Sequence, residues 1–506
     1  NGYVETVGDR AQVIIANPAG VSCNGCGFIN ANRVTLTTGS PIMNNGNLDG
    51  YRVQSGIVSV EGDGLNSSQS DYTDIIARSV EVNAGVWAND LNVVAGANQV
   101  STDLSQVTAI AGSGSASSVA IDVAALGGMY AGKIRLIGTQ AGVGVRNAGN
   151  IGASVGELTL TADGKLINTG SIYAEGNATL STGDDLTNQG IIAAQGDLTL
   201  SGTGSISHID NTGSLIRSGG SLTVTANSVS NDNTQSTDKG LEGNNVSISA
   251  KQISNDTGAI RANNALNLNA TTLLDNQSGL ISSKATLAIT DTSSGTKNLV
   301  VTNTGGNIVA SQSLSVDTAT LSGDGSVVSS GDLSIVLTGN YTHTGVMQAD
   351  ANLDFSTAGN LENQSGISAG NKLILSAGQL TNTSTGQLIG KSTTISGASN
   401  ITNRGLIDGE TSSLSANTVD NLGLGRIYGD HLAIEASTLN NNAESGISAT
   451  LAARDRLDLG VQTLNNGAHS TILSLGDLAI GHNLDSNGFA IGKAGTINNN
   501  SAYIEA

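Results

Sequence analysis

The sequence contains very little proline, very little cysteine and few aromatic residues. Among 506 residues there are two prolines, two cysteines, eight tyrosines, three phenylalanines and one tryptophan. A globular core of this size takes much of its bulk from aromatic rings. The scarcity of rings therefore argues against such a core. The apolar residues are mostly Leu, Ile, Val and Ala, which fill narrow, layered interiors.

Positive charge and long apolar runs are also scarce. The chain has 41 acidic and 21 basic residues, for a formal net charge of −20. Such a protein is repelled by nucleic acid and by anionic membranes, and no basic cluster overrides this effect. No stretch approaches the roughly 20 apolar residues that cross a bilayer. We therefore expect no nucleic-acid partner and no membrane-spanning segment.

The chain does not begin like a newly synthesised secretory protein. No signal peptide opens it, and residue 1 lies just before a segment with strand character, Tyr3–Val7. We expect the sequence to be a piece of a longer protein that lacks its natural beginning.

What the sequence does contain is an internal repeat, which is clearest after about residue 150. An apolar–polar–apolar triplet recurs at intervals of about 20 residues, as in Leu158-Thr159-Leu160, Leu198-Thr199-Leu200 and Leu373-Ile374-Leu375. A second phrase lies between the triplets, with the pattern apolar, any residue, Asn and then a Gly-containing turn. A third short strand follows it, as in Ser171–Ala174.

This pattern predicts an all-β fold. The alternation gives strands with one buried face, and the Gly- and Asn-rich turns reverse the chain often. About 20 residues is too short for a strand–helix–strand unit, but it fits one coil of three short strands. Stacked coils make parallel sheets with strands about 4.8 Å apart. We therefore predict a right-handed parallel β-helix (β-solenoid), with about 20 residues and three strands per coil.

The recurring asparagine gains a meaning in this fold. Asn tolerates left-handed backbone angles in tight turns, and stacked Asn side chains hydrogen-bond along the axis. We expect a structural ladder of Asn168, Asn188, Asn211, Asn255, Asn276, Asn363, Asn382, Asn403 and Asn421. His343 replaces Asn in this column, and we interpret it as a substituted ladder residue rather than a metal ligand.

The first 150 residues carry less regular but more distinctive phrases. Asn17-Pro18-Ala19-Gly20 precedes Cys23-Asn24-Gly25-Cys26-Gly27-Phe28-Ile29-Asn30, and Gly127-Gly128-Met129-Tyr130-Ala131 follows later. These phrases resemble the two-partner-secretion exoproteins, the family of filamentous haemagglutinins and contact-dependent growth inhibition proteins. The Cys-containing segment is most similar to the growth-inhibition branch. The likeness covers residues 1–155 and is architectural afterwards.

The resemblance implies a domain organisation and a function. Residues 1–155 would be the C-terminal portion of the transport domain, and residues 156–506 a haemagglutinin-type repeat shaft. An outer-membrane β-barrel transporter would export the protein to the cell surface. The shaft would present a receptor-binding region, which recognises a surface receptor on a target cell, and a C-terminal toxin, both outside these residues. A filamentous haemagglutinin-type adhesin is the alternative.

The resemblance also assigns a transport motif. The family has an Asn-Pro-Asn-Gly motif, which this chain matches at Asn17, Pro18 and Gly20, with Ala at position 19. The family's earlier Asn-Pro-Asn-Leu motif is absent, which puts unaided secretion of this piece in doubt. From the residues alone, the segment is a turn, because Pro fixes one dihedral and Gly permits a positive one.

Cys23 and Cys26 are the only cysteines. A C-x-x-C pair serves as a redox pair, as half of a zinc site or as a small disulfide. Zinc needs four ligands, and the five histidines lie far along the repeat. No βαβ pattern accompanies the pair. In an oxidising compartment we expect a disulfide that closes a turn.

A remote alternative is a polysaccharide-cleaving β-helix enzyme, which needs clustered carboxylates. The candidates are Asp184 with Asp185, Asp71 with Asp74, and Asp455 with Asp458. Each pair is isolated and near a turn, so solvated turn carboxylates are expected, with no catalytic residue, metal or cofactor. The stretches that break the period, 228–244, 290–299 and 440–451, are interpreted as surface insertions.

Overall fold

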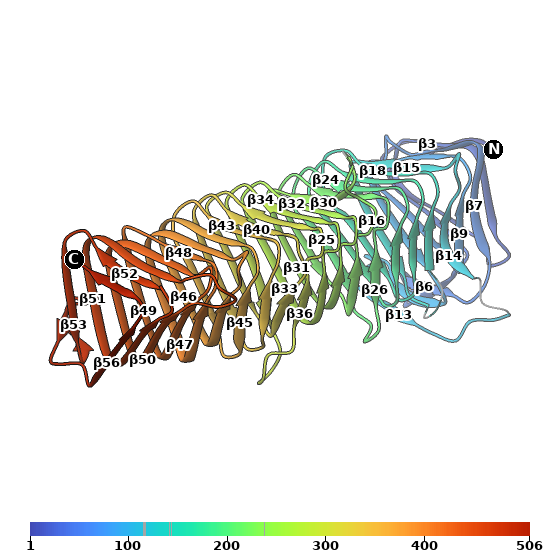
Figure 1. Ribbon diagram of the computed structural model, residues 1–506. Coiled ribbons are helices and arrows are strands. Elements are labelled where there is room, and N and C mark those ends of the chain that lie inside the picture. Colours follow the sequence, from blue (N-terminus) through green and yellow to red (C-terminus); the bar gives the residue numbers. More distant parts are fainter. Residues whose placement is uncertain (115–117, 141, 143, 237) are drawn as a thin grey trace. The chain divides into compact units, whose positions relative to one another are not determined.

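The computed structural model describes residues 1–114, 118–140, 142, 144–236 and 238–506. These residues form strands and turns and no helix, and the parallel strands stack as a β-solenoid of about 23 turns. The predicted fold class is confirmed. The chain divides into two compact units, Asn1–Asn263 and Asn264–Ala506, and the stacking of strands is visible in each (Figure 1).

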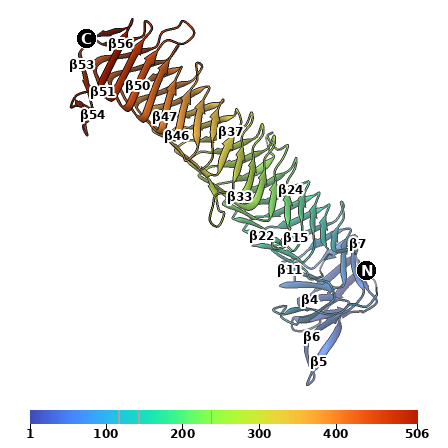
Figure 2. The same cartoon turned by 60° about the horizontal axis from the view of Figure 1, so that its bottom comes forward.

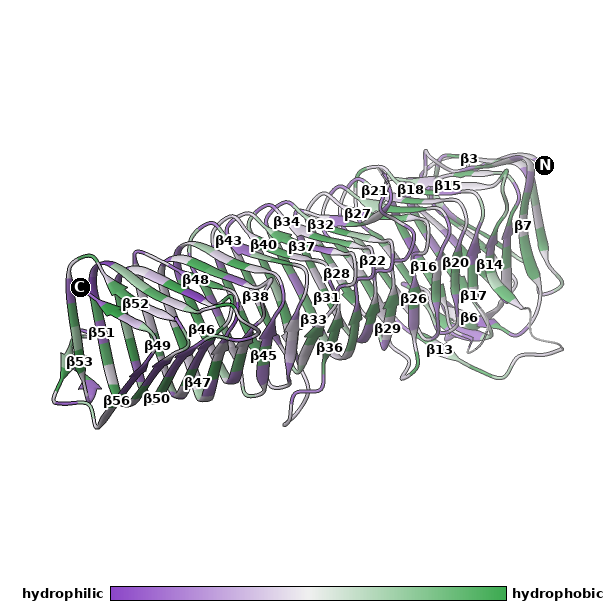
Figure 3. Ribbon diagram, viewed as in Figure 1, coloured by the Kyte–Doolittle hydropathy of each residue, from purple (hydrophilic) through white to green (hydrophobic). Residues whose placement is uncertain are grey.

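Within each unit, a coil passes through three parallel sheets in a fixed order. The triplet sheet contains the apolar–polar–apolar triplets, the asparagine sheet leads into the Asn-containing turns, and the third sheet follows those turns. The strands of one sheet pair in register from coil to coil, as Leu158 with Ala178 and Ala178 with Leu198. Side chains alternate between buried and exposed along each strand because successive residues of a strand point to opposite faces. The alternating hydropathy of the strands is visible in Figure 3.

The strands of the first unit share this order. The triplet sheet comprises β2 (Ala11–Ala16), β4 (Ala31–Thr37), β8 (Tyr72–Ala77), β11 (Asp90–Ala95), β16 (Lys133–Gly138), β19 (Leu158–Ala162), β22 (Ala178–Thr182), β25 (Leu198–Gly202) and β28 (Ser221–Thr225). The asparagine sheet comprises β9 (Ser79–Val82), β14 (Val119–Val123), β17 (Gly144–Asn147), β20 (Leu166–Asn168), β23 (Leu186–Asn188), β26 (His208–Asp210) and β29 (Ser228–Ser230). The third sheet comprises β1 (Gly2–Glu5), β10 (Gly85–Trp87), β15 (Gly128–Ala131), β18 (Asn150–Ala153), β21 (Ser171–Ala174), β24 (Ile191–Ala194), β27 (Leu215–Ser218), β30 (Gly240–Gly243) and β32 (Ala259–Ala262). Three strands bend through a corner and serve two sheets: β3 (Val21–Ile29), β7 (Ile57–Asn66) and β31 (Asn245–Ser254).

The second unit repeats the arrangement with longer continuous strands. Its triplet sheet has β35 (Thr286–Asp291), β38 (Ser313–Thr318), β41 (Asp332–Leu337), β44 (Leu353–Thr357) and β53 (Asp477–Gly481). Its asparagine sheet has β36 (Val300–Thr302), β39 (Thr320–Ser322), β42 (Tyr341–His343), β45 (Asn360–Asn363) and β56 (Thr496–Asn500). Its third sheet has β34 (Leu280–Ser283), β37 (Asn307–Ala310), β40 (Ser326–Ser329), β43 (Val346–Ala349), β48 (Leu406–Asp408), β52 (Thr471–Ser474) and β57 (Tyr503–Glu505). The bent strands are β33 (Ala265–Asp275), β46 (Gly366–Asn382), β47 (Gln387–Asn403), β49 (Thr411–Leu422), β50 (Arg426–Asn442) and β51 (Thr450–Gly467), and β54 (Asn483–Leu484) and β55 (Ala490–Ile491) form a hairpin.

The first unit carries an additional antiparallel sheet that the repeat does not predict. It contains β5 (Ser40–Asn44), β6 (Asn47–Val53), β12 (Asn98–Ser101) and β13 (Val107–Ala109), in the order β13-β12-β6-β5. These strands are inserted where the chain leaves the triplet sheet, and β5 and β6 project from the unit (Figure 2). Tyr51 and Val53 pack with Ile76 and Val94 in a small buried cluster. This cluster attaches the insertion to the coils beneath it.

Candidate functional site

One inward-facing position recurs at the corner between the asparagine sheet and the third sheet, and we call it the corner column. Strand pairing places its members directly above one another in successive coils. In the first unit the column begins with Cys23, Val60, Val82, Val123, Asn147 and Asn168. A cysteine and three valines therefore hold the position that asparagine takes in the later coils.

The asparagines of the first unit donate to one another in series. Asn147 Nδ2 donates to Asn168 Oδ1 over 2.8 Å, and Asn168 Nδ2 donates to Asn188 Oδ1 over 2.8 Å. The series continues from Asn188 through Asn211 and Asn231 to Asn255, with spacings of 2.8, 2.9 and 2.8 Å. Each amide also reaches backbone carbonyl groups at the corner, as Asn168 does with Ile191 O at 3.1 Å.

The second unit has the same series in two segments. Asn276 donates to Asn303 over 2.8 Å. The longer segment runs through Asn363, Asn382, Asn403, Asn421, Asn441, Asn466 and Asn499, with donor–acceptor distances of 2.8 or 2.9 Å. Buried amides satisfied in this way avoid the cost of an unpaired polar group.

The column is interrupted at Gly323 and His343. His343 aligns with Asn363 in strand pairing and is 1% exposed. Its Nε2 lies 3.0 Å from Gly366 O, and its Nδ1 lies 3.2 Å from Tyr341 Oη. A carbonyl oxygen only accepts, so Nε2 carries the proton and Nδ1 accepts from the tyrosine. Burial is the main cause that lowers the pKa of His343 below its usual value.

The sequence reasoning missed several asparagines of the column. They are Asn147, Asn231, Asn303, Asn441, Asn466 and Asn499. All six follow the same apolar–any–Asn phrase, for example Val229-Ser230-Asn231 and Leu464-Asn465-Asn466. Two steps would have found them. One is to apply the phrase to every Val, as at Val419-Asp420-Asn421, and the other is to take the second Asn of each Asn-Asn pair.

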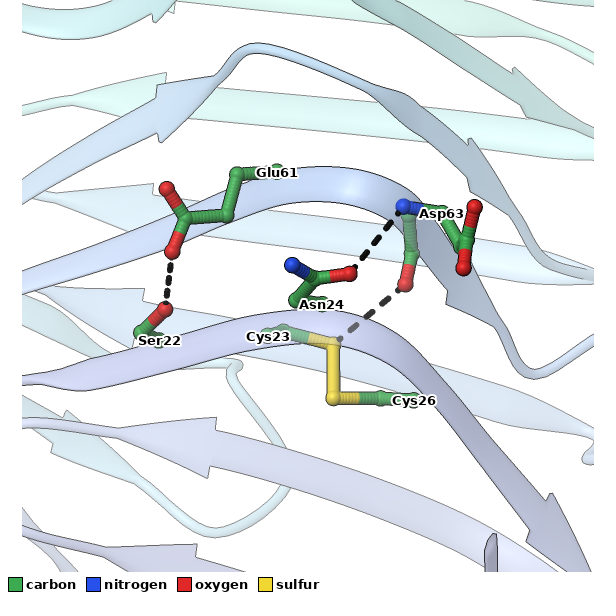
Figure 4. The surroundings of a disulfide bond; sticks show 7 residues. Ser22, Cys23, Asn24, Cys26, Glu61 and Asp63 are labelled. Atoms are coloured by element: carbon green, nitrogen blue, oxygen red, sulfur yellow. Dashed lines mark hydrogen bonds between the residues drawn. A yellow bond between two sulfur atoms is a disulfide. The ribbon is translucent and has the colours of Figure 1, made fainter. Parts of the chain in front are cut away.

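Cys23 and Cys26 are joined as a disulfide at the corner of their coil (Figure 4). Cys23 is fully buried, and Gly25 between the two cysteines has a φ of 65°. The neighbouring coil closes over them: Asn24 Oδ1 accepts from Asp63 N at 3.2 Å, and Ser22 Oγ donates to Glu61 Oε1 at 2.5 Å. The disulfide therefore closes the corner that asparagine amides close elsewhere.

The predicted transport motif forms an exposed turn between β2 and β3. Asn17 Oδ1 accepts from Ala19 N at 3.1 Å, and Gly20 N donates to Asn17 O at 3.0 Å. Gly20 has a φ of 139°, and a Cβ at this position would lie 3.1 Å from Ile57 O of the next coil. The positive φ favours glycine, and a Cβ would in addition press on the backbone of Ile57. The side chains of Asn17 and Pro18 face solvent.

The carboxylates considered for catalysis are not gathered into one site. Asp185 pairs with Lys165 at 3.0 Å, and Asp71 pairs with Arg10 at 3.1 Å. Asp74 is buried against Arg33, at 2.6 Å. Within the described ranges, no group of three or more His, Cys, Asp or Glu residues could hold a metal ion.

Asp458 is the most enclosed of these carboxylates. It is fully buried and bonds to Arg456 Nε at 2.6 Å, His431 Nε2 at 3.0 Å and Ala490 N at 2.9 Å. Burial opposes its ionisation, but these hydrogen bonds outweigh burial and lower the pKa of Asp458. The carboxylate has all these hydrogen-bond partners and connects the β54–β55 hairpin to the coil, which is a structural role.

The period-breaking stretches are tied to neighbouring coils. In 290–299, Asp291 accepts from the backbone N–H groups of Asn298 and Leu299 within the stretch, each at 2.6 Å, and Ser293 Oγ donates to Thr271 O of the preceding coil at 3.1 Å. In 440–451, Glu444 bonds to Arg404. Residue 237 of the stretch 228–244 lies outside the described residues. No helix in the described part of the chain is long and apolar enough to cross a bilayer.

Comparisons with known proteins agree with this architecture. Residues 1–168 match the family model of the TPS secretion domain, and residues 153–207, 174–241 and 241–312 match the haemagglutinin repeat. The chain is 60% identical over 173 residues to the toxin CdiA of Yersinia pestis, covering 34% of this chain and 5% of that protein. It is 52% identical over 167 residues to the 16S rRNA endonuclease CdiA of Enterobacter cloacae, covering 33% and 5%.

Two further likenesses are of the same kind. The tRNA nuclease CdiA of Escherichia coli strain STEC_O31 is 49% identical over 177 residues, covering 35% of this chain and 5% of that protein. The crystal structure of a filamentous hemagglutinin secretion domain is 32% identical, with a TM-score of 0.30, and the match covers 44% of this chain and 65% of that one. The chain spans about 5% of the length of the curated relatives it matches.

A secretion domain continued by haemagglutinin repeats defines a β-solenoid exported by two-partner secretion. Such a protein is secreted to the cell surface or the extracellular space, and its secretion domain implies a transporter in the outer membrane. The TPS secretion domain over residues 1–168 and the haemagglutinin repeats over residues 153–312 together support a two-partner-secretion exoprotein of the filamentous haemagglutinin and CdiA type.

Proposed function

We propose that the chain is the transport domain and shaft of a contact-dependent growth inhibition exoprotein. Residues 1–155 would serve in transport and residues 156–506 as the shaft. The observation that carries this proposal is the 60% identity to a CdiA toxin across the first third of the chain. The TPS match to residues 1–168 supports the transport role, and the stacked coils of the haemagglutinin-repeat region support the shaft.

The chain itself would have no enzymatic activity. Relatives named as nucleases match over only about 5% of their length, which leaves most of each relative to carry its named activity. The carboxylates described above are paired with cations or hydrogen-bonded, which supports a structural role for them. Toxin and receptor-binding regions would lie elsewhere in the complete protein, with the receptor on the target cell.

A co-culture competition tests this function. A strain that produces the complete protein is mixed with a sensitive strain lacking the immunity gene, or is separated from it by a filter. Killing only in the mixed culture supports toxin delivery on contact. Survival in both cultures, together with attachment that depends on the gene, would instead support an adhesin of the filamentous haemagglutinin type.

The transport role of Asn17, Pro18 and Gly20 needs its own experiment. The turn is exposed and joined to the next coil by the bond from Asn17 N to Thr37 O at 3.0 Å, which leaves its side chains accessible to a transporter. Pro18→Ala and Asn17→Ala in the complete protein should reduce its amount at the surface, measured by protease accessibility on intact cells. Pro41→Ala is the matched control, because Pro41 is the second exposed proline and lies outside the motif. Equal export of all variants would contradict the assignment.

A further inference from the structure

An exposed aromatic column runs across the third sheet of the first unit. Its members occupy one outward position in successive coils, because Asn66 pairs with Trp87, Trp87 with Tyr130, Tyr130 with Gly152, and Gly152 with Tyr173. The chain has only twelve aromatic residues, and this column holds the single tryptophan and three tyrosines, Tyr130, Tyr173 and, beyond Asn66 and Gly27, Tyr3. Strands β15, β18 and β21, which carry three of these positions, are labelled toward the N-terminal end of the chain in Figure 3, and β15 and β18 also in Figure 1.

The rings of Trp87 and Tyr130 lie flat on the sheet. A Cβ at Gly85 would come within 2.3 Å of Trp87 Cη2, and a Cβ at Gly128 within 2.6 Å of the Tyr130 hydroxyl. Each ring therefore covers a glycine two positions before it on its own strand. The two centroids are 6.3 Å apart with an interplanar angle of 20°. Trp87 is 42% exposed and Tyr130 is 39% exposed, so each ring turns one broad face to solvent.

The chemistry of this surface is neutral and amphipathic. Each ring combines an apolar face with a polar group at its edge, the indole N–H or the phenol O–H. Asn66 and exposed Asn150 flank the pair with amides. Arg217 enters the column two coils beyond Tyr173, and the Tyr173 hydroxyl donates to Glu175 Oε2 at 2.5 Å, so charge borders the far end of the column. A ligand on Trp87 and Tyr130 meets stacking faces and neutral hydrogen-bonding groups.

We propose that this aromatic platform, formed by Trp87 and Tyr130 and extended by Tyr173, binds an extended neutral polysaccharide of β-linked pyranose units. The C–H face of a pyranose ring carries partial positive charge and stacks on the negative face of an aromatic ring. Two adjacent rings, with Tyr173 two coils beyond Tyr130 in the same line, suit the sugars of a straight glycan. Flat rings have no protruding edge to enter a bilayer or fill a pocket of a protein partner, as interface anchors do.

Trp87 supplies the test directly, since it is the only tryptophan and all indole emission comes from it. The 506-residue chain is titrated with cellohexaose, and tryptophan fluorescence is recorded. A saturable change is expected, with glucose much weaker because one sugar covers one ring only. Tyr130→Ala should weaken cellohexaose binding about tenfold, the order found when one stacking ring is removed. Tyr130→Phe should retain most of the affinity.

Two controls separate recognition from misfolding. Tyr72→Ala removes a comparably exposed tyrosine from the triplet sheet of the same unit and should leave binding unchanged. Circular dichroism should be identical for all variants. The proposal is overturned if cellohexaose leaves the emission unchanged, or if Tyr72→Ala weakens binding as much as Tyr130→Ala. It is also overturned if only the periplasmic part of the transporter alters the emission, which would identify a protein-docking face. None of these outcomes depends on growth inhibition.

Discussion

The early coils of the first unit and the coils that follow close the same corner by different chemistry. Before Asn147 the corner column is apolar or covalently closed, with Val60, Val82 and Val123 above the Cys23–Cys26 disulfide. From Asn147 to Asn255 it is a line of amides that donate to one another in series. Both solutions leave the backbone path unchanged, as the in-register pairing of Val123 with Asn147 shows.

The difference lies in what else the coil must accommodate. The early coils bear long insertions that form β5, β6, β12 and β13, with a separate buried cluster beneath them. The later coils have short turns, and the amide satisfies the backbone carbonyl groups of such a tight corner. A corner that repeats without insertions is stabilised by a side chain that hydrogen-bonds both to its own coil and to the next coil.

The largest effect is expected from breaking the amide line in its middle. Asn403 accepts from Asn382 and donates to Asn421, each over 2.8 Å. Asn403→Ala leaves two buried partners short of a bond and should lower the local free energy of unfolding by about 4 kcal/mol. Hydrogen exchange of β47 and β49 measures this loss. Asn371→Ala, which removes an exposed Asn–Asn pair of 2.9 Å, should cost less than about 1 kcal/mol. If Asn403→Ala and Asn371→Ala lowered the free energy of unfolding equally, burial would not be what makes the amide line stabilising.

A second prediction sharpens the boundary between the two regions. Val82→Asn places an amide between Val60 and Val123 and should destabilise the unit by about 3 kcal/mol, since a buried polar group lacks partners there. Val123→Asn should cost less than about 1 kcal/mol, because its amide would meet Asn147 Oδ1, a buried acceptor without a partner among the described residues. Chemical denaturation of both variants compares them. A similar cost at both positions would show that the amide line cannot be extended.

The disulfide should have an intermediate effect. It closes a loop of four residues, because Cys23 and Cys26 are three positions apart. Loop-closure entropy predicts a stabilisation of about 2 kcal/mol. The double variant Cys23→Val with Cys26→Ala retains an apolar corner and should lose about that amount, measured by thermal unfolding. Adding a reductant should affect the natural chain and leave the double variant unchanged. If reductant also lowered the unfolding temperature of the double variant, the effect of reductant would not come from the Cys23–Cys26 disulfide.

The smallest effect concerns pH at the interrupted position of the column. Burial lowers the pKa of His343 in the folded state. As the pH falls below the unfolded value of about 6.5, the unfolded chain takes up a proton that the folded chain resists, so the free energy of unfolding decreases. The contribution of neutral His343 to the free energy of unfolding is fully present above the unfolded pKa. His343→Asn should remove this slope, as seen in midpoints of thermal unfolding across the range. The exposed His482→Asn variant should retain it.

Much of the architecture could be predicted because neighbouring residues within each repeat determine its strands and turns. The Leu158–Leu160 triplet and the Asn168 turn show which residues face inward without reference to distant residues. The antiparallel sheet could not be found in this way, because its strands, such as β6 and β12, pair across an intervening coil. The alignment of Cys23 with the asparagines was also hidden. It depends on strand register across Val60, Val82 and Val123, which no periodic signal in the sequence reveals.

The amide line has a direction. Every Asn donates to the Asn that follows it in the chain, from Asn147 to Asn255 in one unit and from Asn363 to Asn499 in the other. Within these runs each inner asparagine accepts at Oδ1 from the coil before it and donates from Nδ2 to the coil after it, and Asn147 Oδ1 at the start has no partner among the described residues. A chain that adds coils in sequence order from Asn147 would therefore meet, at each corner of these runs, an amide donor directed at the coil still to be added.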